Sequence, residues 1–308
     1  MWKFIVKNFL YSLLVIIGVI TVTFALLYIV PGDPARMLLG QRADEESVKR
    51  VKEELGLDKP ITTQYLNFIM KAAQGDLGRS YATNREVAAI IIEKFPATAL
   101  LAISAMLLSS ILGVIIGVIS AIRSYSFTDN ASMVFALFGI SIPQFVFALL
   151  MALVFGSILK WLPISGYITD GWDHLILPML TLALRPLAII ARITRSSMLD
   201  VLNQDYIRTA KAKGLSEMKV VFKHSLRNAL TPVVTTLSAS LAATLGGAFF
   251  IEFIFNWPGI GLLAIDSILK LDFPMIQGTV LFSAIIFVLI NFLVDIIYAF
   301  LDPKVKLA

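Results

Sequence analysis

The chain has 308 residues, of which 58% are hydrophobic and only 15% are charged. This composition excludes an ordinary soluble domain of the same length. The absence of cysteine excludes disulfides and thiolate metal sites, and His174 and His224 are too few for a histidine-rich metal site. The net charge of +5 does not indicate nucleic-acid binding, because the basic residues form no patch interleaved with aromatic residues.

Six stretches are apolar and long enough to cross a bilayer, which takes roughly 20 helical residues. The sequence therefore predicts an all-α polytopic membrane protein with spans at 9–30, 97–122, 131–159, 175–198, 229–251 and 275–294. The first is expected to be a retained helix, because its apolar core is longer than that of a typical signal peptide and no small-residue cleavage site follows. Only the fourth carries charge, at Arg185, Arg192 and Arg195.

The distribution of basic residues predicts the orientation. Lys3, Lys7 and Arg123 fall on the same side as the basic segment 199–228, whereas the two short loops on the other side contain only Lys160 and Lys270. In membrane proteins the cytoplasmic loops carry the excess of Lys and Arg. The chain is therefore expected to lie in the cell membrane (inner or plasma membrane), with both termini in the cytoplasm.

Three parts are expected along the chain. Residues 1–30 contain the N-terminal segment and the first span, and residues 31–94 form a small helical extracytoplasmic domain. Within this domain the sequence predicts helices over 44–55 and 61–73, and so small a domain is expected to pack on the membrane part. Residues 95–308 form a core with five further spans.

Three features concern helix packing. Gly113 and Gly117 form a GxxxG pattern, which permits close approach of a neighbouring helix but also occurs by chance in membrane helices. Pro143 predicts a kink in the third span. The fifth span is rich in small residues, which favour tight packing and would also leave room for a passage; its polar members include Ser238, Ser240 and Thr244.

Several kinds of chemistry are absent. No glycine is followed by lysine, so the chain has no phosphate-binding GxxxxGK[ST] loop. It has no HExxH sequence, and two histidines provide no credible Ser/His/Asp set. The sequence therefore predicts a membrane protein that is not an enzyme and binds no cofactor, which leaves a transporter, a channel or a scaffold.

The segment 199–228 is the most informative part. It predicts a short basic helix over 206–213, ended by Gly214, with Ser216 capping a further helix that has an apolar face. Two interpretations remain open. The segment can lie on anionic headgroups as an amphipathic helix, or it can dock on a soluble partner.

The segment resembles the EAA-type coupling loop of ABC-importer permeases, and the whole chain resembles the first permease subunit of the dipeptide, oligopeptide and nickel importers. Arg208-Thr-Ala210 stands where the general loop begins Glu-Ala-Ala, and Pro232 comes later than in the general pattern; both features are similar to the peptide and nickel branch. The matching stretches, in order, are Pro31-Gly-Asp-Pro34, Gly56-Leu-Asp, Gly75-Asp-Leu-Gly78, Ser141-Ile-Pro143, Arg192-Ile-Thr-Arg195-Ser-Ser-Met-Leu199, Asp205-Tyr-Ile-Arg-Thr-Ala-Lys-Ala-Lys-Gly214, His224-Ser-Leu-Arg-Asn-Ala-Leu230, Glu252-Phe-Ile-Phe-Asn-Trp-Pro-Gly259, Asn291-Phe-Leu-Val-Asp295 and Asp302-Pro-Lys304.

The resemblance implies a type I ABC-importer permease. The expected partners are a second homologous permease subunit, two cytoplasmic ABC ATPase subunits that bind ATP and Mg, an extracytoplasmic substrate-binding protein and membrane lipid, without nucleic acid. The ATPases would push the coupling loop, and peptides are the expected substrate, with nickel chelates and other small solutes as alternatives. An ion-coupled secondary transporter and a non-transporting scaffold are less favoured.

Candidate site residues fall into three groups. The ATPase-coupling loop comprises Tyr206, Ala210, Gly214, Leu215, Ser216, Val220 and Val221. Pathway or gate candidates are Arg185, Ser238, Ser240, Thr244 and Trp257, and Asp295 is expected to pair with Arg192 or Arg195. For Arg185 two interpretations stay open: a cavity-lining cation that meets a substrate carboxylate, or an ion pair with Glu252, Asp266 or a partner subunit.

Overall fold

The computed structural model describes residues 2–29, 34–39 and 44–301. These ranges fold into helices joined by turns, and the only β-type pairing among them is an isolated bridge between Arg79 and Glu86. The predicted all-α class is confirmed. The matching residues at 31–33 and 302–304 lie outside the described ranges.

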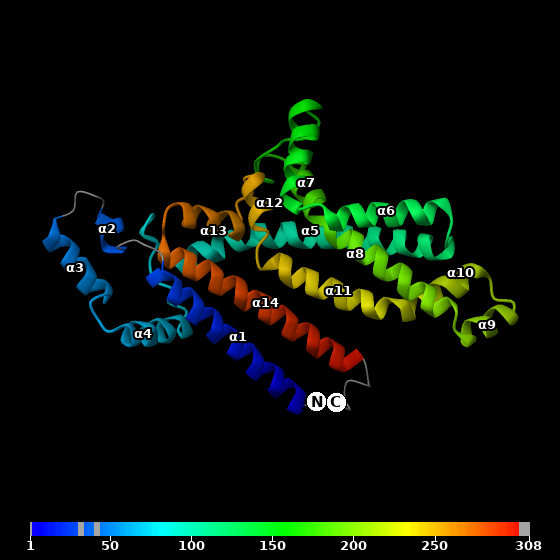
Figure 1. The fold of residues 1–308 in the computed structure, drawn as a ribbon, viewed down its shortest axis with the longest axis horizontal. Coiled ribbons are helices and arrows are strands. Elements are labelled where there is room, and N and C mark those ends of the chain that lie inside the picture. The colour runs from blue at the N-terminus through cyan, green and yellow to red at the C-terminus, as the bar shows by residue number, and fades with distance from the viewer. Residues whose placement is uncertain (1, 30–33, 40–43, 302–308) are drawn as a thin grey trace. The chain divides into compact units, whose positions relative to one another are not determined.

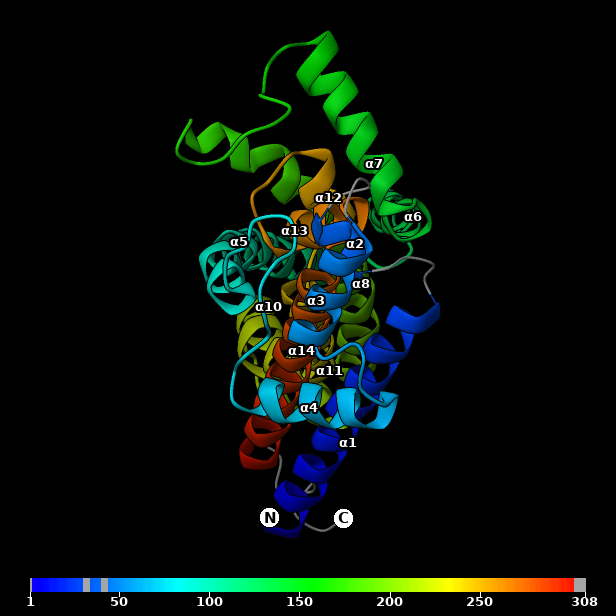
Figure 2. The same ribbon diagram turned by 90° about the vertical axis from the view of Figure 1, so that its left-hand side faces the viewer.

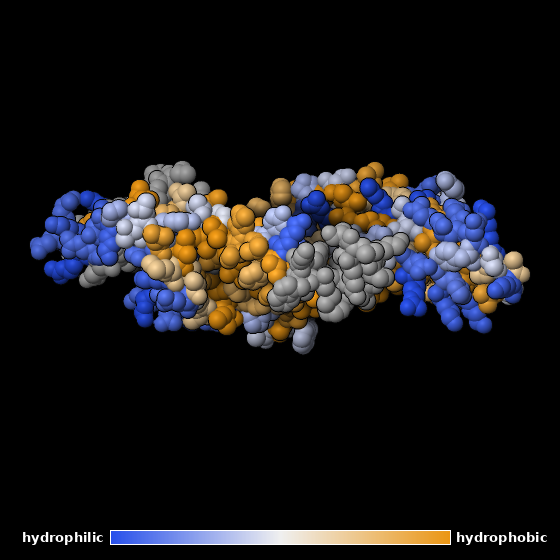
Figure 3. All heavy atoms as spheres, turned by 90° about the horizontal axis from the view of Figure 1, so that it is seen from below, coloured by the Kyte–Doolittle hydropathy of each residue, from blue (hydrophilic) through white to orange (hydrophobic). Residues whose placement is uncertain are grey.

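Four predicted spans correspond to long apolar helices. Within the described residues, Val6–Ala25, Val87–Ile122, Trp172–Leu202 and Phe273–Val294 are long and apolar enough to cross a membrane. They belong to α1 (Trp2–Ile29), α5 (Val87–Ile122), α8 (Ile176–Leu202) with the turn η2 (Trp172–Leu175) before it, and α14 (Phe273–Leu301). Hydrophobic residues accordingly form much of the surface in Figure 3.

The third predicted span is broken where the sequence places Pro143. Two residues separate α6 (Phe127–Ser141) from α7 (Gln144–Met151), which continues as the π-helical turn η1 (Ala152–Ile158). The two halves are bent by 104°. Proline cannot donate the backbone hydrogen bond that would continue α6, so the predicted kink is a complete break.

The fifth predicted span requires a correction. The sequence predicts one helix over 229–251, but α11 (Arg227–Leu245) ends at Leu245 and a separate short helix, α12 (Phe249–Ile254), follows. Gly247 between them has φ +128°, a conformation that favours glycine and interrupts the helix. Helix α11 is not among the helices of the described chain that are long and apolar enough to cross a membrane.

The chain divides into two compact units. The first contains residues 1–98, 245–249 and 258–308. In it α1 and α14 run side by side, as both Figure 1 and Figure 2 show. Its core is formed where the start of α5 meets α14 and the ten-residue helix α13 (Ile260–Leu269), by Val87, Ile90, Ile91, Ile260 and Met275.

Three shorter helices follow α1 in the same unit: α2 (Pro34–Leu39), α3 (Glu45–Leu55) and α4 (Ile61–Ala73). The predictions for 44–55 and 61–73 are confirmed. Asp44 begins α3 by accepting a hydrogen bond from the Ser47 N–H at 3.0 Å. Helix α4 packs on α1, where the rings of Tyr65 and Phe24 lie 5.3 Å apart, which agrees with a domain that rests on a membrane helix.

The second unit contains residues 99–244 and 250–257. Here α5 and α8 approach closely at the GxxxG pattern. A methyl group added at Gly113 would lie 2.8 Å from Ile190, and one added at Gly117 would lie 2.5 Å from Thr194 and 2.6 Å from the Ala191 carbonyl oxygen. The two glycines therefore serve close helix packing, which was one of the two interpretations of the pattern.

Candidate functional site

The segment between α8 and α11 forms a folded elbow, which we call the coupling loop. It consists of α9 (Asp205–Ala212), the one-turn α10 (Glu217–Lys219) and the π-helical turn η3 (Val220–Leu226). The apolar side chains of Ile207, Ala210 and Val220 are buried together, with Val201, Leu202 and Leu215 packed around them. Because Val201 and Leu202 belong to the end of α8, this small core joins α9 to the membrane helix.

Gly214 ends α9 as predicted. Its backbone has φ +75°, and its N–H donates to the Lys211 carbonyl at 2.9 Å. Apart from Gly214 and its two chain neighbours, no atom of the described chain lies within 4 Å of the position that a Cβ would take there. The glycine is therefore required by the backbone conformation and not by crowding within this chain.

The structure divides the predicted coupling residues into two sets. Ala210, Val220 and Val221 are buried, so within this chain they hold the loop in shape. Tyr206, Gly214 and Ser216 are exposed and Leu215 is half-buried, so these residues are available to a partner. Val221 packs on Met198 and Ala229, in a second core that includes the C-terminal end of α5.

Two exposed apolar side chains on the same loop were not among the predicted coupling residues, although Phe222 was expected on the apolar face of the second loop helix. Met218 is 69% exposed and Phe222 is 53% exposed, although both stand among charged residues on short helical turns. Lys211, Lys213 and Lys219 are exposed nearby, and hydrophilic residues gather over α9 at the right of Figure 3. An exposed mixture of apolar and basic side chains on a rigid loop is suited to docking on a protein surface.

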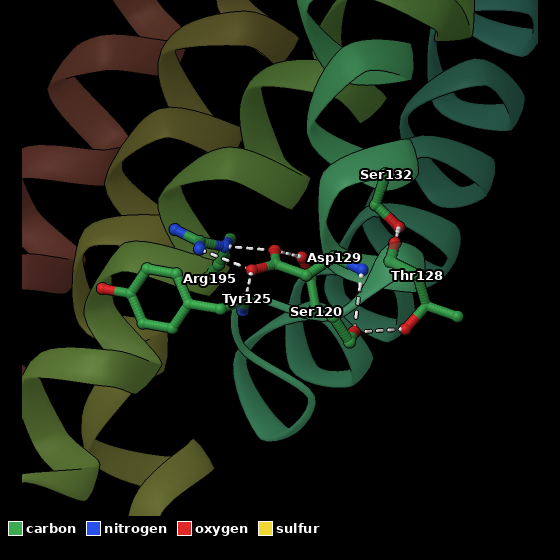
Figure 4. Close-up of polar contacts among 7 residues, drawn as sticks. Ser120, Tyr125, Thr128, Asp129, Ser132 and Arg195 are labelled. Atoms are coloured by element: carbon green, nitrogen blue, oxygen red, sulfur yellow. Dashed lines mark hydrogen bonds and ion pairs between the residues drawn. The ribbon is translucent and has the colours of Figure 1, made fainter.

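An ion pair that was not predicted fixes α8 to the neighbouring helix. Arg195 donates to Asp129 from Nε at 2.5 Å and from a terminal guanidinium nitrogen at 2.7 Å (Figure 4). The Asp129 carboxylate also accepts from the Ser120 hydroxyl and from the Tyr125 N–H, the latter at 2.8 Å. Asp129 is 1% exposed, so its charge is satisfied entirely within the chain.

These contacts hold the turn between α5 and α6 on α8. The sequence predicted Arg195 or Arg192 as a partner of Asp295; the side chain of Asp295 lies outside the described part of the chain. Asp129 was not singled out because it stands two residues before the predicted third span. An acidic residue at the start of an apolar helix, facing a basic residue in another span, was the available signal.

The pathway candidates differ in exposure. Arg185 is exposed on α8 and has no ion pair with any described side chain. Ser238 and Thr244 are half-buried and donate to the carbonyls of Val234 and Ser240, one turn earlier on their own helix. Ser240 is also half-buried.

Trp257 lies elsewhere in the second unit. Its side chain is fully buried, and its ring packs on Tyr167 with the ring centroids 4.8 Å apart. The described residues hold no group of three His, Asp or Glu side chains that could bind a metal ion. In this chain the clearest candidate for a functional surface is therefore the coupling loop.

Comparison with known proteins identifies relatives over the full length. The family model described as "Binding-protein-dependent transport system inner membrane component" matches residues 113–307, and the model of the N-terminal part of such components matches residues 1–102. The chain is 42% identical over 306 residues to "Glutathione transport system permease protein GsiC" of Escherichia coli O6:H1, covering 99% of both chains. It is 41% identical over the same length to the protein of that name from Escherichia coli K12 and from Shigella flexneri serotype 5b.

The fold is similar to that of a solved transporter structure. That structure is an inward-facing conformation of the MetNI methionine ABC transporter, with a TM-score of 0.55 and 18% sequence identity. The match covers 69% of this chain and 96% of that chain. At this identity the similarity concerns the fold alone.

Proposed function

Because the chain belongs to the family of binding-protein-dependent transport system inner membrane components, we propose that it is the permease subunit of an ATP-driven peptide importer. The family makes it an ABC-importer permease and a multi-pass membrane protein that is not itself an enzyme. Peptides are proposed as the substrate because relatives that match over their full length are named as glutathione permeases. We place both termini in the cytoplasm, on the distribution of basic residues.

The main support for this proposal is that the coupling loop exposes a docking surface. The chain has no phosphate-binding loop of its own, so ATP and Mg are proposed to bind in partner ATPase subunits. The exposed residues Tyr206, Gly214, Ser216, Met218 and Phe222 offer those subunits a docking surface. A second permease subunit and an external binding protein complete the proposed assembly.

The coupling loop packs directly on a membrane helix, so a movement of the loop would be transmitted to that helix. Ile207 of α9 is fully buried beside Val201 and Leu202 of α8, so a push on α9 moves the end of α8. Helix α8 is joined to α6 through Asp129 and Arg195, and to α5 through the close contact at Gly117. Packed helices move as rigid bodies, so ATP-driven movement at the loop would displace this group of helices together.

Two measurements test the proposal. A tagged chain purified from its native membranes should bring down two ATPase subunits and a second permease. Uptake of a labelled tripeptide into proteoliposomes with the external binding protein should require internal ATP and persist when ion gradients are dissipated. Uptake that follows an ion gradient and ignores ATP would identify a secondary transporter instead, and a chain that copurifies alone and moves no solute would indicate a scaffold.

A further inference from the structure

Helix α8 exposes an unusual set of side chains. Of its 27 residues, the exposed ones in the described structure are Arg185, Arg192, Ser196 and Asp200. None of its large apolar side chains is exposed, whereas α1, α5 and α14 all expose several. A membrane helix that faces lipid presents apolar side chains, so the exposed side of α8 does not face lipid.

The exposed residues lie on one side of the helix. Arg185 and Arg192 are seven residues apart, which is close to two turns and about 10 Å along the axis. Ser196 follows one turn after Arg192, and the acidic Asp200 follows one turn later where α8 approaches the coupling loop. We call Arg185, Arg192 and Ser196 the cationic stripe.

The third arginine of α8, Arg195, has a structural role, because a carboxylate of the same chain neutralises its charge. Arg195 is bound by Asp129 in a two-pronged ion pair and belongs to the packed side of the helix. Arg185 and Arg192 have no carboxylate within 4.0 Å among the described side chains, and both are exposed. The helix therefore carries one arginine that is satisfied within the chain and two that are not.

A charged side chain inside the bilayer faces a water-filled cavity or a partner of opposite charge. Contacts between membrane helices are typically built from small residues, and the exposed side of α8 has none except Ser196. A side that exposes only polar and charged groups is better matched to water and to a solute than to a second helix.

We infer that the cationic stripe lines the translocation pathway and receives the carboxylates of anionic peptides in succession, first at one arginine and then at the other. The planar guanidinium binds a carboxylate through two parallel hydrogen bonds, as Arg195 does with Asp129. This inference rests on the proposed function, since it names the substrate class of the same permease.

Cysteine accessibility tests the stripe without measuring transport. The chain has no native cysteine, so a single Ile189→Cys substitution places a unique thiol between the two arginines. In the assembled complex, with and without ATP, water-soluble thiosulfonate reagents of negative and of positive charge should both modify it. The stripe should favour the anionic reagent, and Arg185→Gln with Arg192→Gln should lower the anionic-to-cationic rate ratio about 10-fold.

Two results would overturn the inference. A thiol that reacts with neither reagent in any nucleotide state lies against lipid or against an acidic partner helix. A rate ratio that is unchanged by removing both arginines shows that they do not act on the pathway. Arg123→Gln, which removes an exposed arginine from the turn after α5, is the matched control and should leave the ratio unchanged.

Uptake then tests the substrate class. Ala-Glu-Ala and Ala-Gln-Ala have the same length and differ by one carboxylate. Each variant's uptake is divided by wild-type uptake of the same peptide, so selection by the binding protein cancels. Arg185→Gln should reduce relative uptake of Ala-Glu-Ala several-fold more than that of Ala-Gln-Ala, and an equal loss for both would contradict the inference. Failure of the wild type to use ATP would contradict the proposed function alone, because the thiol measurement does not depend on transport.

Discussion

Arg195 holds Asp129 through two hydrogen bonds, at 2.5 and 2.7 Å, and thereby joins α8 to the start of α6. The Asp129 carboxylate is 1% exposed and the Arg195 side chain 22% exposed. An ion pair this well covered is weak evidence of net stabilisation, because both charges lose their hydration. Removing one partner is different, since it leaves the other charge buried and unpaired.

We expect Asp129→Asn to lower the free energy of unfolding by about 3 kcal/mol, which is typical for breaking a buried pair. The thermal unfolding midpoint of the detergent-purified protein should fall accordingly. The double variant Asp129→Asn with Arg195→Gln should lose less than the sum of the two single changes, because the second substitution removes the unpaired charge.

A surface pair provides the control. Arg208 and Asp205 lie 3.4 Å apart on α9, with side chains 74% and 96% exposed. Arg208→Gln should change the free energy of unfolding by less than about 0.5 kcal/mol. Equal losses at the two pairs, or strict additivity of the Asp129 and Arg195 changes, would show that the buried pair has no special part in stability.

The close contact of α5 with α8 gives a second prediction. A methyl group at Gly117 would lie 2.6 Å from the backbone oxygen of Ala191, which cannot move without shifting α8. Gly117→Ala should therefore destabilise the protein by about 1–3 kcal/mol, the usual cost of overpacking. The thermal midpoint measures this loss.

Gly18 on α1 is the matched helical glycine, because an added Cβ there would meet no atom of the described chain within 4 Å outside its chain neighbours and the adjacent backbone of α1. Gly18→Ala should cause no loss and can raise stability slightly through helix propensity. If Gly117→Ala were as harmless as Gly18→Ala, the GxxxG pattern would be incidental to packing.

Much of the helical framework could be predicted from sequence, because it follows from local signals. Long apolar runs, Pro143, the capping residue Asp44 and the left-handed Gly214 each act on their immediate neighbours. The fifth span was predicted too long because hydrophobicity continues past Leu245, while the glycines that follow end the helix. Apolar composition alone does not mark where a helix stops.

The site was less predictable because it depends on contacts between distant residues. Asp129 and Arg195 are 66 residues apart, and nothing local pairs them. Val220, Val221 and Phe222 were expected on one apolar face that a partner could use. In the structure Val220 packs on α9, and Val221 packs on α5, α8 and α11, so both valines are buried. Met218 on the one-turn α10 and Phe222 on the π-helical turn η3 take exposed positions instead.

A third prediction concerns Tyr81, in the turn before α5. Burial, and then the negative charge of Asp272, raise the pKa of Tyr81 from 10.0 to about 12. Between these two pH values the unfolded chain has lost the phenolic proton and the folded chain keeps it, so the free energy of unfolding falls as pH rises. The contribution is fully present below pH 10 and is lost as pH approaches 12.

Tyr81→Phe removes this titration. From pH 9 to pH 12 the wild type should lose on the order of 2 kcal/mol more than Tyr81→Phe, measured as the difference between their unfolding free energies at each pH. Other tyrosines and lysines titrate equally in both proteins and cancel in this difference. Parallel pH profiles would mean that the Tyr81 hydroxyl is not held in its neutral form by the fold.

The last prediction tests the coupling loop at Gly214. Proline fixes φ near −65° and has no N–H, whereas Gly214 has φ +75° and donates to the Lys211 carbonyl. Gly214→Pro should therefore reshape the end of α9 while leaving the membrane helices inserted. Allosteric coupling is typically worth about 1–3 kcal/mol, so peptide uptake should fall about 10-fold while ATP hydrolysis by the complex continues.

An asparagine variant at the same position distinguishes the effect of the backbone conformation from the effect of side-chain size. It tolerates the left-handed conformation, and the described chain leaves its side chain free space, so Gly214→Asn should retain the shape of the loop. Uptake retained by the asparagine variant and lost by the proline variant would assign coupling to the loop conformation. Loss in both would point to a partner surface pressed against Gly214. Normal uptake by Gly214→Pro, at normal membrane levels, would remove the coupling role from this loop.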